Sequence, residues 1–257
     1  MPAAVEAAVT VHVEDHGRVR LVALDRPEVR NALDPATDDE LREIFVDFAR
    51  DDRAWVAVLA GEGEHFCAGA DLRARQGARH RTPEGGITRD FSTNKPILAA
   101  LHGAVFGGGL ELALCADVRI ADETAQLGQL EVRWGIMPGA GGTQRLPRLV
   151  GLGVALELVM TGDPIDAHRA ERVGLVNRVV PAGQARAAAM EMAQTIASRA
   201  PLGVRRAKEA TLRGLHMPLD DGIRMESLVA NLLAGTEDLR EGRRAFLEKR
   251  IPRFEGR

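Results

Sequence analysis

The sequence predicts an α/β protein with a helical C-terminal region. Short apolar segments of strand character alternate with segments of helical periodicity in the first part of the chain, which is typical of a core with parallel strands. From about residue 153 the pattern is mostly helical. The 257 residues contain no internal repeat or low-complexity linker, so one large core with an appendage accounts for the length. We expect the core over residues 1–200 and the helical region over 201–257.

The first 60 residues contain clear sequence signals for two strands, a helix and a third strand. Residues 9–14 and 18–24 resemble two strands around a turn at His16 and Gly17. Asp34 followed by Pro35 predicts a helix start, because Asp caps a helix and Pro is tolerated at its first position. Leu41, Ile44, Phe45 and Phe48 then recur on one helical face, and 54–60 is an apolar strand.

Further along the chain, strands are predicted at 96–101, 118–121 and 176–180. Thr143 and Asp166 are placed to cap two helices. Long helices are predicted at 184–199, 202–215, 219–233 and 237–249. The polar segment 73–93 gives no clear element signal, and we expect it to be mobile or variable.

The bulk properties exclude several classes of protein. With a net charge of -3 and a pI of about 6.2, the protein has no overall positive potential that would attract nucleic acid. Aromatic residues are 4% and Tyr is absent, which argues against base stacking. No apolar run could span a bilayer, and the first residues lack a secretory signal. Two cysteines, Cys67 and Cys115, form no disulfide framework, so we expect a cytoplasmic protein. No cofactor or metal is expected, since no ligand motif is present.

The segment 103–115 carries the strongest chemical signal. Three consecutive glycines, Gly107–Gly109, let another molecule approach the backbone, and the apolar run after them predicts a buried helix. The start of such a helix presents free N–H groups. The run contains one carboxylate, Glu111, and a buried carboxylate must be paired, neutralised or used. Together these features indicate chemistry at a carbonyl.

Each of these residues also has a simpler interpretation. Glu111 could complement a helix dipole, which stabilises by ~0.3–1 kcal/mol, and Glu131 could pair with Arg133 or Arg145. Cys67 is more typical of a small packing residue than of a nucleophile. Neither Gly107–Gly109 nor Gly139–Gly142 matches a nucleotide-binding fingerprint.

Three motifs together resemble the crotonase family, the enoyl-CoA hydratases and isomerases. They are Phe66-Cys-Ala-Gly-Ala-Asp-Leu72, Gly107-Gly-Gly-Leu-Glu-Leu-Ala113 and Pro138-Gly-Ala-Gly-Gly-Thr-Gln-Arg-Leu146. The resemblance begins near Arg26 and extends to Arg250. It implies a crotonase-like spiral of ββα repeats with a C-terminal helical trimerisation region, assembled as a trimer or as a hexamer of two trimers.

The resemblance also implies the reacting groups. The thioester oxygen of an acyl-CoA would lie between the N–H groups of Ala68 and Gly108, which form an oxyanion hole. Glu111 and Glu131, 20 residues apart, match the two catalytic glutamates of the hydratases. Leu130 replaces the proline of the family motif, which could move the second carboxylate. We assign proton delivery at Cα to Glu131 and activation of the water to Glu111.

The binding residues that the resemblance implies lie in three parts of the chain. The loop after Cys67 would follow the pantetheine of CoA, and a C-terminal pair from a neighbouring subunit would meet the adenine. Trp134 would shape the acyl site. Arg73 to Arg81 is expected to be a solvated face, with contact to CoA phosphates as a weaker alternative. The full set of expected binding residues is Ala68, Gly69, Ala70, Asp71, Leu72, Gly108, Trp134, Phe246 and Lys249.

The sequence thus predicts an enoyl-CoA hydratase, a lyase of fatty acid and lipid metabolism. The nearest alternative is an enoyl-CoA isomerase, which can operate with Glu131 alone; decarboxylation and hydrolysis are also open. A different class would be a non-catalytic family member that binds acyl-CoA or RNA, and the negative charge argues against RNA. The expected partners are an acyl-CoA substrate and further copies of the chain, with no nucleic acid and no membrane.

Overall fold

A computed structural model describes residues 10–75 and 84–257. Its centre is a six-stranded sheet in the order β1-β2-β3-β4-β6-β9. The β1–β2 pair is antiparallel, and every later pair in this sheet is parallel, which confirms the predicted α/β class. The strands are β1 (Val11–His16), β2 (Val19–Leu24), β3 (Val56–Gly61), β4 (Ile97–Leu101), β6 (Val118–Asp122) and β9 (Arg178–Val180).

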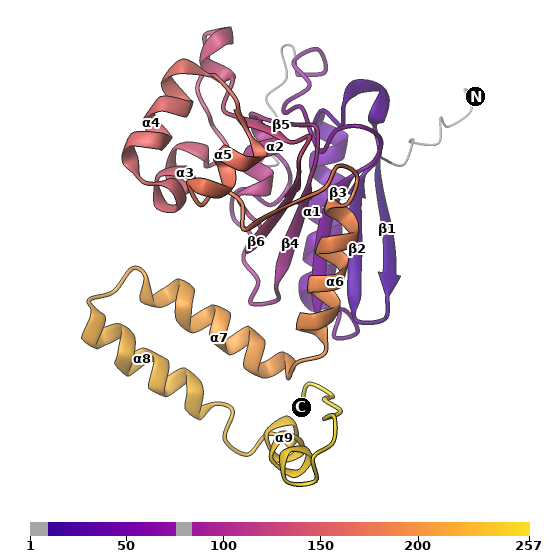
Figure 1. The fold of residues 1–257 in the computed structure, drawn as a ribbon, viewed down its shortest axis with the longest axis vertical. Helices are drawn as coiled ribbons and strands as arrows, with labels where there is room; N and C mark the ends of the chain where they lie inside the picture. The colour runs from indigo at the N-terminus through magenta and orange to yellow at the C-terminus, as the bar shows by residue number, and fades with distance from the viewer. Residues whose placement is uncertain (1–9, 76–83) are drawn as a thin grey trace, which may run out of the picture.

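Two helices cover opposite faces of this sheet (Figure 1). Helix α1 (Pro35–Arg50) adds Phe45 and Phe48 to a cluster with one set of strand residues, and α6 (Ala185–Ala197) adds its alanines to a cluster with the alternate set. Successive strand side chains point to opposite faces, and β2 and β3 are buried at every position, with Arg20 of β2 as their one charged residue. Asp34 caps α1 by accepting from Thr37 N at 2.8 Å, as predicted.

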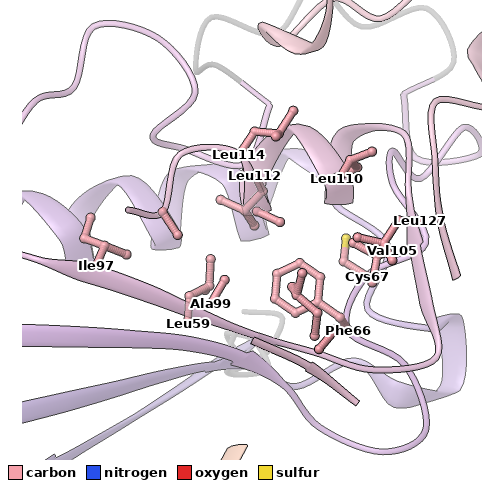
Figure 2. Packing of buried hydrophobic residues seen from close by; sticks show 14 of the residues in the cluster. Leu59, Phe66, Cys67, Ile97, Ala99, Val105, Leu110, Leu112, Leu114 and Leu127 are labelled. Carbon is pink, nitrogen blue, oxygen red and sulfur yellow. The ribbon is translucent and has the colours of Figure 1, made fainter. Parts of the chain in front are cut away.

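A short helix, α2 (Gly108–Ala113), is buried along its whole length. Leu110 and Leu112 pack in the same cluster as Phe66, Cys67 and Leu127 (Figure 2). A small sheet lies beside it, made of β5 (Ala104–Phe106), β7 (Gln126–Gly128) and β8 (Ile165–Asp166). This packing fixes the glycine turn at the start of α2 within the core.

A 3-10 helix, η1 (Pro27–Val29), lies between β2 and α1. Further short helices lie between β7 and α6: the 3-10 helix η2 (Glu131–Trp134) and the α-helices α3 (Gly142–Val150), α4 (Leu152–Thr161) and α5 (Ala167–Arg172). Asp166 caps α5, as predicted, by accepting from Arg169 N at 2.6 Å. The predicted cap at Thr143 is wrong, because α3 already begins at Gly142 and Gly141 occupies the cap position.

The C-terminal helices lie largely apart from the core (Figure 1). They are α7 (Pro201–Gly214), α8 (Leu219–Asn231) and α9 (Glu237–Leu247). Lys208 Nζ donates to Asp117 Oδ2 at 2.7 Å, and Phe254 packs against the cluster that contains Trp55; both contacts attach the region to the core. Among the residues described, no helix is long and apolar enough to cross a membrane.

The polar segment 73–93 is described only in part, because 76–83 lie outside the described residues. Residues 84–90 form turns and bends, and 91–93 are irregular. The prediction that Arg73 to Arg81 form a solvated face is wrong at Arg75, whose guanidinium pairs with the buried carboxylate of Asp38. This ion pair ties the beginning of the segment to α1.

Candidate active site

The loop that follows the first expected oxyanion donor, Ala68, lies directly against the start of α2. Leu33 N donates to Gly69 O at 2.8 Å, and Asp71 N donates to Leu33 O at 2.9 Å, which fixes the loop on both sides. A Cβ at Gly69 would lie 2.8 Å from Phe106 O and 3.3 Å from Gly108 N, so only glycine permits this approach. The two backbone segments that the sequence predicts as oxyanion donors, 68–71 and 107–109, are therefore adjacent.

The structure corrects one of the two predicted oxyanion donors. The N–H of Ala68 donates to Arg30 O at 2.9 Å, so it is not available to a ligand. Two positions later, the N–H of Ala70 has no acceptor among the described residues, and neither has that of Gly108 at the first turn of α2. The two unused donors at this junction are Ala70 and Gly108, in place of the expected Ala68 and Gly108.

Glu111 is held by the second glycine-rich loop. Its side chain is 1% exposed, and Oε1 accepts from both Ala140 N and Gly142 N at 2.7 Å. Burial raises the pKa of this carboxyl, and the two backbone donors oppose that shift. Loop 140–142 thus gives Glu111 a fixed direction, which the dipole-only interpretation of this residue does not require.

Glu131 lies on the other side of the turn, at the start of η2. Its Oε1 is 3.4 Å from where a Cβ of Gly107 would be, and Oε2 is buried without a partner among the described residues. Burial, followed by the nearby carboxylates of Glu111 and Glu84, raises the pKa of Glu131 to about 7. Such a carboxyl is divided between its acid and base forms near neutral pH.

The simpler interpretation of Glu131 as half of a surface ion pair is not what the structure shows. Arg133 pairs with Asp163. Arg145 donates to Thr88 O at 2.7 Å and to Ala140 O at 3.1 Å. Both cations are therefore engaged elsewhere, and Glu131 keeps its carboxyl for the site.

Two site residues were not predicted as such. Gln129 is fully buried, and neither atom of its amide has a partner within the described chain; Gly142 leaves room for it beside Glu111. Glu84 lies against Gly108, where its Oε1 would overlap an added Cβ. Burial raises the pKa of Glu84 to about 7, with Glu111 and Asp38 acting in the same direction. The sequence gives no signal for Glu84, because it lies in a polar, charged segment. Only the fold brings residue 84 to α2.

The remaining predicted binding residues lie at the surface or in the loop. Asp71 caps the turn after it, with Oδ1 accepting from Arg73 N and Ala74 N at 3.1 Å, and Leu72 is exposed. Trp134 is 70% exposed at the end of η2, and Phe246 is 84% exposed on α9. Lys249 follows α9 with a left-handed backbone. Nothing in the single chain tests their contact with CoA, so those roles stay predictions.

Both cysteines are free thiols, Cys67 buried and Cys115 half-buried. Burial raises the pKa of Cys67 to about 12 and that of Cys115 to about 11, which makes both thiols poor nucleophiles at neutral pH. Cys67 packs between Phe66 and α2 (Figure 2). Within residues 10–75 and 84–257, no cluster of His, Cys, Asp and Glu could hold a metal ion.

The fold and the site define a class of protein: an α/β core that presents two free N–H donors beside three carboxyls, an arrangement suited to enolate chemistry at a carbonyl. The model of the enoyl-CoA hydratase/isomerase family matches residues 14–257. The chain therefore belongs to this family, which confirms the resemblance found in its sequence.

Individual relatives support the same assignment. The chain is 40% identical to an (E)-benzylidenesuccinyl-CoA hydratase of Thauera aromatica, with 96% of this chain and 99% of the relative covered. It is 39% identical to a short-chain-enoyl-CoA hydratase of Clostridium acetobutylicum, covering 93% and 95%. The crystal structure of an enoyl-CoA hydratase from Bacillus anthracis matches with a TM-score of 0.91 at 39% identity, covering 97% and 100%.

Proposed function

We propose that this protein adds water across the double bond of a 2-enoyl-CoA. One observation carries the proposal: two carboxyls in different environments, Glu111 and Glu131, interact beside a glycine turn that has two N–H donors without acceptors among the described residues. Hydration requires a base for the water, an acid for Cα and a site for negative charge on the thioester oxygen. The candidate site offers all three, and the relatives named as hydratases support the assignment.

The thioester oxygen would be bound by the N–H groups of Ala70 and Gly108. Negative charge gathers on this oxygen as the water attacks Cβ and the π electrons move toward the carbonyl. Donors that are already oriented stabilise that charge without reorganisation, and one such donor contributes about 3 kcal/mol. The fixed backbone of the 69–71 loop provides this orientation.

The two glutamates would divide the proton transfers. Glu111, oriented through Oε1, would accept the proton that the water loses as its oxygen bonds to Cβ. Glu131, protonated for part of the time near pH 7, would donate its proton to Cα of the enolate. The product is a 3-hydroxyacyl-CoA, and proton exchange with solvent returns both carboxyls to their starting forms.

The isomerase alternative is less well supported. Isomerisation moves one proton between two carbons and needs no activated water. The two backbone bonds that orient Glu111 would have no purpose in a reaction carried by Glu131 alone. Glu111 therefore favours hydration.

We also propose that three chains assemble into a trimer, or that two such trimers form a hexamer. We further propose that the protein acts in the cytoplasm, in fatty acid metabolism. The support for assembly is the apolar surface of α7 and α8, since large exposed apolar areas mark protein interfaces. Its exposed residues are Leu212, Leu215, Leu219, Ile223, Leu228 and Leu232. Phe246 and Lys249 would then meet the adenine of a CoA bound to a neighbouring chain.

The test is to mix the purified protein with crotonyl-CoA and follow the loss of the conjugated-enoyl absorbance, with the product identified by mass. The expected result is loss of absorbance with a gain of one water. A product of unchanged mass whose double bond has moved would indicate the isomerase. No turnover and no binding of crotonyl-CoA would contradict the proposal.

A further inference from the structure

Glu84 is fixed in place by a turn that is anchored on α1. Gly85 N donates to Asp38 Oδ1 at 2.7 Å, and the Thr88 hydroxyl donates to Glu84 O at 2.6 Å. Gly86 has a φ of +69°, and a Cβ there would lie 2.6 Å from Arg42 N, so the turn requires glycine. The direction of Glu84 is thus set by the fold.

The carboxyl of Glu84 lies against Gly108 and makes no hydrogen bond or ion pair with any residue that the structure describes. Glu111 on α2, Glu131 on η2 and Asp38 on α1 are carboxyls whose charges act on it. Among the described residues, Arg75 and Arg89 oppose them, but Arg75 pairs with Asp38 and Arg89 donates to Gly139 O, and burial still raises the pKa of Glu84 overall. The acyl group bound at Gly108 would therefore meet a third carboxyl.

We propose that Glu84 determines which acyl groups the site accepts, by rejecting 2-enoyl-CoA substrates that carry a carboxylate next to the double bond. The inference rests on the proposed function, because it takes Gly108 as the place where the thioester binds. A second carboxylate brought into this cluster would be repelled by Glu84, which is bonded to no cation among the described residues. A neutral acyl group meets no such penalty.

Membership of the family does not by itself establish which acyl groups this chain accepts. The relatives at about 40% identity include one named for a benzylidenesuccinyl group and one named for short-chain enoyl groups. Acyl selection therefore varies among chains of this similarity, and it must depend on individual side chains near the reacting bond. Glu84 is such a side chain.

The test compares two matched substrates at pH 8. Glutaconyl-CoA is crotonyl-CoA with a carboxylate on C4, and its carboxamide is a neutral analogue of nearly the same size. For the wild-type protein we expect kcat/KM for the carboxylate to be at least about tenfold below that for the carboxamide. In Glu84→Gln this ratio should shrink by about tenfold, mainly through a lower KM for the carboxylate.

Glu123→Gln is the matched control, because it removes the same charge from an exposed position after β6. Its substrate ratio should equal that of the wild type. An unchanged ratio in Glu84→Gln, or equal activity of the wild type on both substrates, would overturn the proposal. If crotonyl-CoA is bound but not hydrated, the hydratase assignment fails separately, and the same comparison is made from the dissociation constants of butyryl-CoA and glutaryl-CoA.

Discussion

Loop 140–142 and segment 129–131 flank the same glycine turn, but the first forms hydrogen bonds with its polar groups and the second leaves polar groups unpaired. The loop directs two backbone N–H groups to a single oxygen of Glu111. The segment leaves the amide of Gln129 and Oε2 of Glu131 buried without partners among the described residues. An unpaired buried polar group costs stability. One side of the site therefore holds its carboxyl in a fixed orientation, while the other side has polar groups that can bind a ligand or water.

Removing the open carboxyl should give the largest loss of activity. Glu131→Gln cannot donate a carboxyl proton to Cα, so we expect kcat for crotonyl-CoA to fall on the order of 10²–10⁴-fold. Because Gln is of similar size, the dissociation constant of butyryl-CoA should stay close to that of the wild type. Steady-state kinetics and a binding titration measure the two quantities. Wild-type turnover in this variant would remove Glu131 from the mechanism.

Changing the fixed carboxyl should separate its chemical role from its structural role. Glu111→Gln keeps an oxygen for Ala140 N and Gly142 N but cannot accept the proton of the water, so kcat should fall by on the order of 10²-fold with the fold retained. Glu111→Ala leaves two buried N–H groups unpaired and should also unfold more easily, by about 1–3 kcal/mol for each group.

Denaturant unfolding of Glu111→Gln, Glu111→Ala and Glu131→Ala tests the contrast directly. Only Glu111→Ala should lose stability, because Glu131 receives no bond from another residue in the described chain that its removal would break. Equal destabilisation of Glu111→Ala and Glu131→Ala would show that the two sides of the site do not differ as described.

Most of the fold could be predicted because its elements depend on local signals. Asp34 with Pro35 identifies the start of α1, and strands such as β3 are short apolar runs. The predicted cap at Thr143 is wrong by two residues, since Gly141 and Gly142 allow α3 to begin before a conventional cap residue. Helix boundaries are where sequence patterns are least specific.

The site was predictable to a lesser degree. Glu111 and Glu131 are found from motif spacing, but the choice between Ala68 and Ala70 depends on which N–H faces the ligand. That direction is set by Arg30, which occupies the N–H of Ala68 and lies far away in the sequence. Glu84 could not be predicted, because its role depends on the meeting of three distant segments at Gly108. Contacts of this kind are properties of the tertiary structure.

The smallest expected effect concerns stability and its pH dependence. The pKa of Glu131 is about 7 in the folded chain and 4.5 for an ordinary glutamate, so between these values the folded state binds more protons than the unfolded state. Stability therefore falls as pH rises through this window, and the ionised carboxyl is a cost at pH 8.

Glu131→Gln removes that cost. Since the carboxyl is only partly buried, solvent screens the effect, and we expect a rise in Tm of about 2 °C at pH 8. At pH 4.5 the variant and the wild type should melt together. Thermal scans at fixed protein concentration, with Glu123→Gln as control, measure the difference, and a gain of equal size at both pH values would mean that the stabilisation does not come from the unpaired carboxylate.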